Sequence, residues 1–352
     1  ADNLGLIYDT LAMQSLDEPI TEYGLVAGKI EKAPDNSWVR FYLRPEARFH
    51  DGHPIRAEDV VFTFQELIKE GSPIYRTYYA DVDEVIAEDP LKVLFKFKRT
   101  NNRELPLILG LRPILQKAQW EGKDFTASTL EAPIGSGPYV IAEFEAGKYV
   151  TYRKNPDWWG ADLPFNRGQH NLDEIRYDYF GDAGVVFEAF KAGEITSYRE
   201  ANPVKWDQNY DFPAVTAGDV EKSVIPHSRP SGIEGFVFNT RKPMFADWRV
   251  REALIHAFNF ELVNQTLNGG ALPRITSYFS NSSLGMEPGT PAEGAVAALL
   301  EPFKAELLPG ALEGYALPVS DGTEANRQNI RAAVALLEEA GWSVQDGVLK
   351  NA

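Results

Sequence analysis

The sequence predicts a mixed α/β protein with more than one lobe, and two observations support this class. Segments with the two-residue alternation of half-buried strands are interspersed with segments whose apolar residues recur at helical spacing. The chain also has 352 residues, which exceeds the usual size of a single hydrophobic core. We therefore expect sheets covered by helices, distributed over at least two lobes.

The expected strands and helices follow from these two periodicities. In residues 92–98, Val93, Phe95 and Phe97 face one way and lysines face the other, which is typical of a strand with one solvated face. We predict strands over residues 38–44, 82–88, 92–98, 138–144, 148–154, 174–180, 222–226 and 235–239. We predict helices over residues 57–69, 184–192, 247–258, 260–267 and 326–340, and a short one over residues 295–300.

Two helices in the C-terminal half are well specified. Asp247 can cap the first of them, and Val250, Leu254 and Phe258 form an apolar stripe that we expect to be buried. In the helix over residues 326–340, apolar residues again share one side. Both helices should therefore pack against other elements.

The composition excludes several classes of function. Lys and Arg total 35 against 51 Asp and Glu, and the resulting formal net charge of −16 argues against nonspecific binding to nucleic acid or anionic membranes. Cysteine is absent, which excludes disulfides, thiol catalysis and cysteine-ligated metal. No apolar run is long enough to predict a membrane span, and we expect any export signal to lie outside this chain.

Two short clusters could carry chemistry, but each has a simpler explanation. His50, Asp51 and His53 place two imidazoles near a carboxylate, yet zinc needs three or four ligands and no further histidine cluster follows, so we predict a turn and no metal site. Ser136 lies between two glycines, whereas a nucleophile elbow needs Gly-x-Ser-x-Gly between a strand and a helix. We predict a backbone bend there.

Carboxylate pairs occur in the sequence, but they do not indicate a catalytic site. Glu143 with Glu145, or Asp178 with Asp182, could act as the acid and base of a glycosidase, but 51 acidic residues produce such pairs by chance. No Gly-rich phosphate-binding motif occurs. We therefore predict no catalytic residue and no cofactor.

The segment from Trp38 to Phe64 carries the most information. It reads WVRFYLRPEARFHDGHPIRAEDVVFTF, which is an alternating strand, an Asp-Gly turn and a helix with Glu58 and Asp59 in its first turn. This order resembles the signature of extracellular solute-binding proteins of family 5, the receptors of peptide ABC transporters.

Later motifs continue this resemblance in the order of the family. They are IGSGPYVIAEF from Ile134, YRKNPDWWG from Tyr152 and FVFNTRKPMFADWRVREALIHAFNFELV from Phe236. Residues 163–194 and 225–243 look most like the YejA-like oligopeptide-binding branch. The resemblance covers nearly the whole chain.

The resemblance implies a fold and a lobe arrangement. It implies a periplasmic binding protein of type II, with several lobes around a cleft, incomplete in this chain because family members are longer and both ends look truncated. The implied lobes are residues 1–12 with 126–236, an inserted lobe over 13–125, and the first part of a third lobe over 237–352.

The resemblance also implies a function. We expect a non-enzymatic receptor in the periplasm of a Gram-negative bacterium, which binds an oligopeptide and delivers it to ABC permease subunits in the inner membrane. The partners would include the remaining part of its own chain, and the carboxylate that meets the peptide's amino terminus is expected beyond Ala352. The alternatives are another family 5 solute (an oligosaccharide, an opine or a nickel chelate) and, from another class, a hydrolase of peptides or glycans.

Ligand contacts are implied at three places. The segment over residues 71–79 resembles the one that contributes an aromatic ring to the cleft, although the spacing does not select the ring. Tyr8 lies where the first strand at the cleft edge ends, and residues 239–241 lie where the chain crosses between lobes, either as a hinge or as a plain strand end. We predict ligand binding by Tyr8, Tyr75, Tyr78, Tyr79, Asn239, Thr240 and Arg241.

Two further features concern packing. Trp158 and Trp159 follow a turn and are expected to pack inside a lobe. Arg56 occupies the capping position of the helix over residues 57–69, where the family usually has Thr. An arginine offers no acceptor, so we expect a cost of about 0.5–2 kcal/mol unless another group caps the helix.

Overall fold

The computed structural model describes residues 4–15, 18 and 21–351 of the chain. It contains two compact units, Ala1–Ala183 and Gly184–Ala352, and each is described by itself. Both contain helices and strands, so the mixed α/β class is confirmed. Within the described residues, no helix combines the length and the apolar character needed to cross a membrane.

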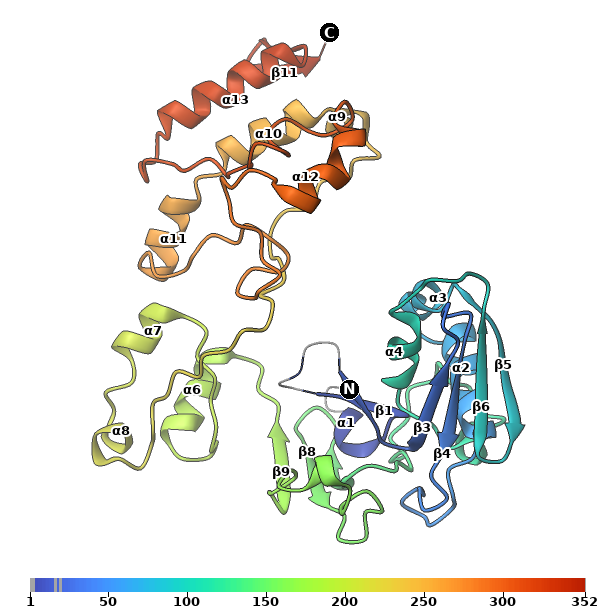
Figure 1. Cartoon of the computed structure of the whole chain (residues 1–352). Coiled ribbons are helices and arrows are strands. Elements are labelled where there is room, and N and C mark those ends of the chain that lie inside the picture. Colours follow the sequence, from blue (N-terminus) through green and yellow to red (C-terminus); the bar gives the residue numbers. More distant parts are fainter. Residues whose placement is uncertain (1–3, 16–17, 19–20, 352) are drawn as a thin grey trace. The chain divides into compact units, whose positions relative to one another are not determined.

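The first unit contains a four-stranded antiparallel sheet in the order β3-β4-β6-β5. Side chains of β4 alternate, with Val39, Phe41 and Leu43 buried on the face that helix α2 covers (Figure 1). The sheet thus follows the predicted alternation, with its apolar face turned to a helix. Its elements are β3 (Ala27–Lys32), β4 (Trp38–Leu43), β5 (Val82–Asp89), β6 (Lys92–Phe97) and α2 (Ala57–Lys69).

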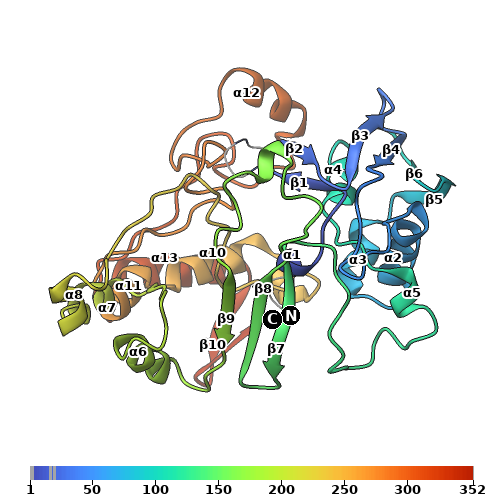
Figure 2. The ribbon, with the colours of Figure 1, turned by 90° about the horizontal axis from the view of Figure 1, so that it is seen from below.

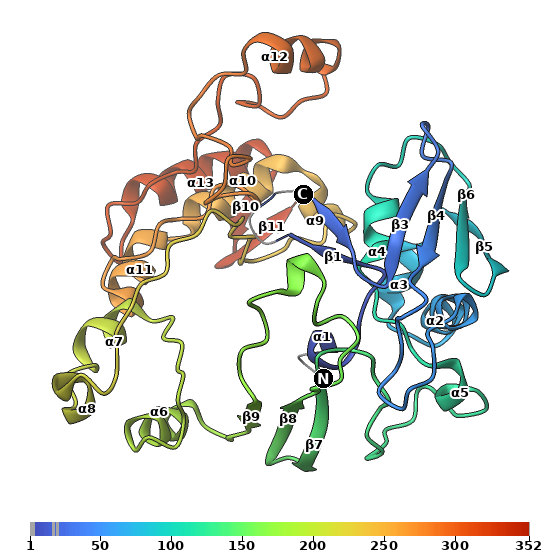
Figure 3. The same ribbon diagram turned by 60° about the horizontal axis from the view of Figure 1, so that its bottom comes forward.

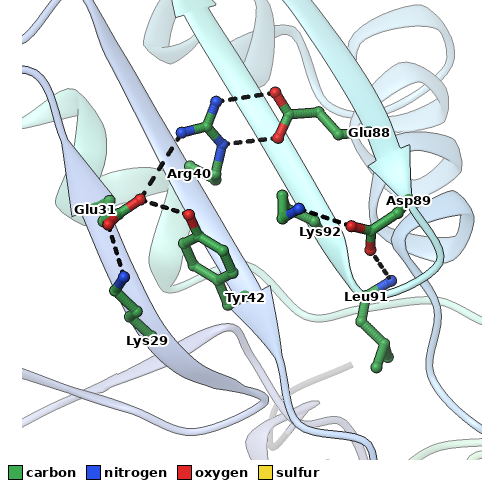
Figure 4. A network of polar contacts seen from close by, with 8 residues as sticks. All are labelled: Lys29, Glu31, Arg40, Tyr42, Glu88, Asp89, Leu91 and Lys92. Atoms are coloured by element: carbon green, nitrogen blue, oxygen red, sulfur yellow. Dashed lines mark hydrogen bonds and ion pairs between the residues drawn. The ribbon is translucent and has the colours of Figure 1, made fainter.

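The other face of this sheet carries ion pairs and hydrogen bonds between polar side chains, within a strand and across strands (Figure 4). Arg40 donates to both carboxylate oxygens of Glu88, at 2.7 and 2.9 Å. Glu31 accepts from Lys29 at 2.6 Å and from the hydroxyl of Tyr42 at 2.5 Å. These groups are largely solvated, so each pair contributes little stability, but together they keep the outer face of the sheet polar.

A second sheet, β7-β8-β9, lies next to α1 in the same unit (Figure 2). Its strands are β7 (Tyr139–Glu145), β8 (Tyr149–Lys154) and β9 (Glu174–Asp178), all antiparallel. The remaining elements of this unit are α1 (Leu4–Ile7), β1 (Ala12–Gln14), β2 (Glu22–Gly24), α3 (Pro73–Tyr78), α4 (Leu105–Gly110), α5 (Lys117–Trp120) and η1 (Pro164–Asn166).

Two hydrophobic cores divide the first unit between them. The larger one, here the α2 core, contains the inner face of the four-stranded sheet together with Leu11 and Ile114. The smaller one, here the α1 core, contains Tyr8, Leu115 and Tyr139. The chain therefore passes between the cores near residues 8–11 and again near residues 114–115.

The start of α2 is capped without help from the side chain of Arg56. The buried carboxylate of Asp59 accepts a hydrogen bond from the backbone amide of Arg56 at 2.9 Å, and a second from the amide of Lys117, also at 2.9 Å. One acceptor thus serves the helix start and ties α2 to α5. The expected missing side-chain cap is real, and Asp59 supplies half of a capping box.

Serine in place of Arg56 is expected to raise the free energy of unfolding by about 1 kcal/mol, since its hydroxyl can accept from an amide of the first turn. Urea unfolding would measure the change. The matched control is Arg56→Ala, which removes the guanidinium and adds no acceptor. Equal stabilisation by both changes would contradict a capping effect.

The second unit is mainly helical. Helices α10 and α13 lie side by side (Figure 1 and Figure 3), and the side chain of Asp247 caps α10 as predicted by accepting from the amide of Arg249. Gly341 follows α13 with φ of +85°. The helices are α6 (Ala183–Lys191), α7 (Pro203–Gln208), α8 (Pro213–Ala217), α9 (Pro243–Ala246), α10 (Trp248–Ala257), α11 (Phe260–Asn268), α12 (Gly294–Leu300), η2 (Glu301–Phe303) and α13 (Arg327–Glu339). A hairpin of β10 (Trp342–Gln345) and β11 (Val348–Asn351) follows.

Two predictions for this unit are wrong. Residues 222–226 and 235–239 are not strands, because no described segment forms a ladder with them, and Val237 is 95% exposed. The apolar stripe of α10 is only partly buried: Val250 is covered, whereas Leu254 and Phe258 are exposed. Alternation and helical periodicity show which face of a segment could be buried, but they do not show whether a neighbouring strand or helix is present to cover it.

Candidate functional site

The segment Tyr8–Leu11, here the junction segment, joins the two cores of the first unit. Tyr8 is buried in the α1 core, and burial raises the pKa of its hydroxyl to about 12. Leu11 belongs to the α2 core. Between them, Thr10 forms an isolated bridge with Pro113. The predicted ligand residue Tyr8 is therefore buried next to the crossing point.

Asp9 fastens the junction segment to three distant parts of the chain. Its carboxylate is buried and accepts from the indole nitrogens of Trp159 at 2.8 Å and Trp158 at 3.2 Å. Its amide donates to Oγ of Ser136 at 2.9 Å, and its carbonyl accepts from the amide of Ile114 at 3.1 Å. We call Asp9, Ser136, Trp158 and Trp159 the Asp9 cluster.

No cation compensates the carboxylate of Asp9 among the described residues. Burial raises its pKa from 3.8 to about 7, although the hydrogen bonds from Trp158, Trp159 and Ser136 act in the opposite direction. Neutral donors stabilise a charge less than a paired cation does, so the cost of removing the carboxylate from water prevails. Asp9 is thus a titratable group at the crossing point.

The bend over residues 135–137 brings Ser136 to Asp9. The amides of Ser136 and Gly137 both donate to the carbonyl of Ile7, at 2.8 and 2.6 Å. His50 donates from its amide to the carbonyl of Gly135 at 2.8 Å, and its Nε2 lies 2.9 Å from the carbonyl of Gly137. Ser136 is 1% exposed and accepts from Asp9, so its hydroxyl belongs to the bend and not to an accessible nucleophile.

A polar cavity of about 170 Å³ lies beside the Asp9 cluster. It is large enough to hold several waters, each of which needs about 10–15 Å³ of such space. Its lining comes from the loop before α2, the bend and the turn before the two tryptophans. The lining residues are Arg48, Phe49, His50, Gly52, Ser136, Asn155, Asp157 and Trp159.

The three predicted tyrosines at α3 surround one cation. The guanidinium of Arg112 lies 5.4, 5.9 and 6.0 Å from the ring centroids of Tyr75, Tyr78 and Tyr79, which is cation–π distance. Tyr79 is buried and stacks on Tyr75 at 6.1 Å. Tyr78 is 48% exposed. Among the three rings, Tyr78 therefore offers the most surface to a ligand.

A small apolar cavity of about 20 Å³ lies in the α2 core beside these rings. Tyr79 and Arg112 both line it, and the hydroxyl of Tyr79 and Nε of Arg112 are buried without a hydrogen-bond partner among the described residues. Its size suits a single water and no larger ligand.

The predicted residues 239–241 lie in the second unit, before α9. Oδ1 of Asn239 accepts from the amide of Arg241 at 3.2 Å and from its Nε at 3.1 Å. The amide of Lys242 donates to the carbonyl of Asn239 at 3.0 Å. The segment is an exposed turn, held by its own side chain.

The predicted ligand residues thus fall into three groups. Tyr75, Tyr78 and Tyr79 are brought together, Tyr8 lies in the other core of the same unit, and residues 239–241 belong to the other unit. Ligand binding by these residues remains a prediction.

Sequence reasoning missed Asp9 and Arg112, although both had a signal. Asp9 is a lone charge in LGLIYDTLAM, and Arg112 is a lone charge in LPLILGLRPIL. A single charged residue inside an apolar run is rarely buried without a specific partner.

The histidine-containing turn is held by contacts of Asp51, one within the turn and one with Gln116. Oδ2 of Asp51 lies 3.0 Å from Nδ1 of His53 and accepts from Nε2 of Gln116 at 2.8 Å. No group of three or more potential ligands that could hold a metal occurs within residues 4–15, 18 and 21–351. His53 is exposed, and His50 bonds to the bend instead.

Solved structures share this fold. The oligopeptide-binding protein AppA of Bacillus subtilis, in complex with a nonapeptide, matches 99% of the chain with a TM-score of 0.67 at 20% identity, and 61% of AppA is covered. NikZ of Campylobacter jejuni, in complex with Ni(L-His), matches 99% of the chain with a TM-score of 0.66 at 18% identity, and 60% of NikZ is covered. The fold is that of a solute-binding protein, as expected.

Sequence comparison gives the family. The model described as Bacterial extracellular solute-binding proteins, family 5 Middle, matches residues 21–351, and the chain belongs to this family. A putative binding protein of Brucella melitensis is 40% identical over 97% of the chain and 56% of its own length. In Agrobacterium fabrum, the peptidoglycan-binding protein YepA is 39% identical over 99% of the chain and 58% of its length. The probable peptide-binding protein YejA of the same organism is 38% identical over 100% of the chain and 58% of its length. The chain thus resembles YejA-type proteins and spans little more than half of these relatives.

Proposed function

We propose that this chain is part of a receptor of an ABC importer, which binds oligopeptides in a cleft between lobes and delivers them to permease subunits in the inner membrane. The observation that carries the proposal is the family match over residues 21–351, together with 38% identity to a probable peptide-binding YejA protein. The location would be the periplasm of a Gram-negative bacterium. The whole activity belongs to a protein as long as these relatives.

A general peptide receptor must recognise what all peptides share. Main-chain amides and carbonyls can be met by backbone groups of extended segments, while side chains occupy roomy, hydrated pockets. The segment over residues 235–238 leaves such backbone groups unpaired among the described residues. The proposed contacts from side chains are those predicted above, with Tyr78 as the most accessible ring.

The proposed lobes keep the bounds given by the family. They are residues 1–12 with 126–236, residues 13–125, and residues 237–352. The separation of two cores near residues 8–11 and 114–115 supports the first boundaries.

The remaining part of the longer protein is the proposed partner of the second unit. Leu254 and Val334 are exposed on α10 and α13, Phe258 is exposed just after α10, and Phe236 and Val237 are exposed in the segment over residues 235–239. A packed lobe would bury such side chains, each contributing about 1.5–3 kcal/mol.

A second candidate ligand is a peptide derived from peptidoglycan. The 39% identity to a protein named as peptidoglycan-binding favours it. Such a ligand keeps the main-chain groups of a peptide, so the same receptor mechanism applies. Only its size and attached sugars differ.

Calorimetry with the chain lengthened to match its relatives tests both ligands. Unrelated tri- to pentapeptides should bind with similar affinity if the receptor is general, and a peptidoglycan fragment should bind more tightly if it is the ligand. Binding of only a sugar, an opine or a nickel chelate would contradict the peptide proposal, and turnover of a labelled peptide would favour a hydrolase.

Replacing Tyr78 by Ala should weaken peptide binding about 10-fold, the loss expected for one aromatic contact of roughly 1–1.5 kcal/mol. The matched control is Tyr179→Ala, which removes another exposed tyrosine of the first unit. An equal loss in both variants, or in neither, would remove Tyr78 from the site.

A further inference from the structure

The Asp9 cluster has a composition that ordinary packing does not require. A 2%-exposed carboxylate meets two indole N–H groups and a serine hydroxyl, and none of these can neutralise a negative charge. Amide or hydroxyl side chains could accept the same hydrogen bonds without ionising. The carboxylate therefore brings to the crossing point a property that an amide lacks, which is exchange of a proton.

The charged and titratable groups around the cluster leave this carboxylate unpaired. Arg48, His50 and Asp157 line the adjacent cavity with Ser136 and Trp159, and the His170 ring packs on Trp158 at 5.3 Å. Tyr8 precedes Asp9, and Arg112 precedes the second crossing near residues 114–115 but faces the tyrosines of α3. His50 bonds to Gly137, and Arg112 lies over rings. None of these groups bonds to the carboxylate of Asp9 within the part of the chain that the structure describes.

We infer that Asp9 is a proton-binding positioning residue: its buried carboxyl group, held by two indole N–H groups beside a polar cavity, exchanges a proton and so changes how firmly the junction segment is fastened to the tryptophan pair. When protonated, the group is neutral and its hydroxyl can donate to Ser136. When ionised, it places an uncompensated charge between the two cores. The adjacent cavity, which Ser136 and Trp159 line, has room for waters that would hydrate this charge.

Proton exchange at Asp9 would also affect the capture of solutes, a step that rests on the proposed function. Tyr8 and Thr10 flank Asp9, and Thr10 bridges to Pro113 on the second crossing segment. Weaker contacts between Asp9 and the two tryptophans would let both crossing segments move relative to the bend. Peptide affinity should therefore differ between pH 6 and pH 8.

Fluorine NMR of the full chain labelled with 5-fluorotryptophan tests the proton-binding step directly. The resonances of Trp158 and Trp159, assigned with the Trp158→Phe and Trp159→Phe variants, should shift with one shared midpoint near pH 7, the pKa of about 7 expected for Asp9. Asp9→Asn should abolish this titration. A pair of resonances that does not move between pH 5 and pH 9, or that still titrates in Asp9→Asn, would overturn the inference.

Two further variants separate Asp9 from its neighbours. His50→Gln removes the imidazole closest to the bend and should leave the midpoint in place; loss of the titration would transfer it to His50. Ser136→Ala removes one hydrogen bond to the ionised form and should raise the midpoint by about one pH unit. This second variant also keeps the test decisive if Asp9→Asn fails to fold.

Calorimetry with one tripeptide at pH 6 and pH 8 then tests the functional step in the lengthened chain. An affinity ratio that disappears in Asp9→Asn supports it, and a ratio unchanged in Asp9→Asn contradicts it. If no peptide binds at either pH, the proposed function fails while the NMR titration still decides the proton site.

Discussion

Asparagine in place of Asp9 is expected to raise the free energy of unfolding of the first unit by about 4 kcal/mol at pH 8 and to change it little at pH 4. The folded-state pKa of about 7 exceeds the ordinary value of 3.8 by about three units, at about 1.36 kcal/mol per unit. A raised pKa means that the folded protein binds the proton more tightly. The stabilisation that comes from proton binding at Asp9 is therefore full below pH 3.8 and is lost as the pH rises to about 7.

The asparagine variant lacks this dependence because an amide does not ionise. Urea unfolding followed by tryptophan fluorescence would measure the difference, in a background where Trp206, Trp248 and Trp342 are replaced by Phe so that the signal reports the first unit. Burial also raises the pKa of Glu22 to about 7, but Glu22 is present in both proteins and cancels in the difference. A stability gain that is equal at pH 5 and pH 8 would show that the charge of Asp9 is not its cause.

Alanine in place of Gly135 is expected to lower the free energy of unfolding by about 3 kcal/mol, which is typical of severe overpacking. A Cβ atom at this position would lie 2.1 Å from the carbonyl oxygen of Ile7 and 2.4 Å from its side chain. The bend cannot yield without breaking the bonds that the amides of Ser136 and Gly137 donate to the same carbonyl. The Asp9 cluster should therefore loosen as well.

The matched control is Gly181→Ala, since no atom lies within 4 Å of a Cβ atom built there. This variant should stay within about 0.5 kcal/mol of the parent. The same urea experiment measures both variants. A similar small effect in the two would mean that the bend tolerates a side chain and does not hold the junction segment.

Local pattern predicted helix α2 and six of the seven strands in the two larger sheets of the first unit, but it missed β3 and the shorter elements. The alternation in WVRFYL predicted strand β4, and the periodicity in AEDVVFTF predicted helix α2. Both predictions are confirmed because the apolar faces of β4 and α2 are buried in the same core of the first unit. The predicted strands over residues 222–226 and 235–239 are wrong because, in the part of the chain that the structure describes, these segments have no neighbouring strand. A strand exists only through the ladder it forms, and within the described residues no segment pairs with either.

The candidate site was less predictable than the fold. Tyr75, Tyr78 and Tyr79 were selected by resemblance, but the sequence does not reveal that Arg112, more than 30 residues later, lies among their rings. Trp158 and Trp159 were expected to pack inside a lobe. They do pack, and they also donate to Asp9, about 150 residues earlier.

The sequence by itself determined the α/β class, the family and the positions of the helices and strands that bury one face locally. Only the tertiary structure decided that Asp9 lies between two cores without a cation, and that the bend at Gly135 closes over Ile7. The physical reason is one of range. Periodicity and turn chemistry act over a few residues, whereas desolvation of a charge and exclusion of a Cβ atom depend on every segment that surrounds a point in space.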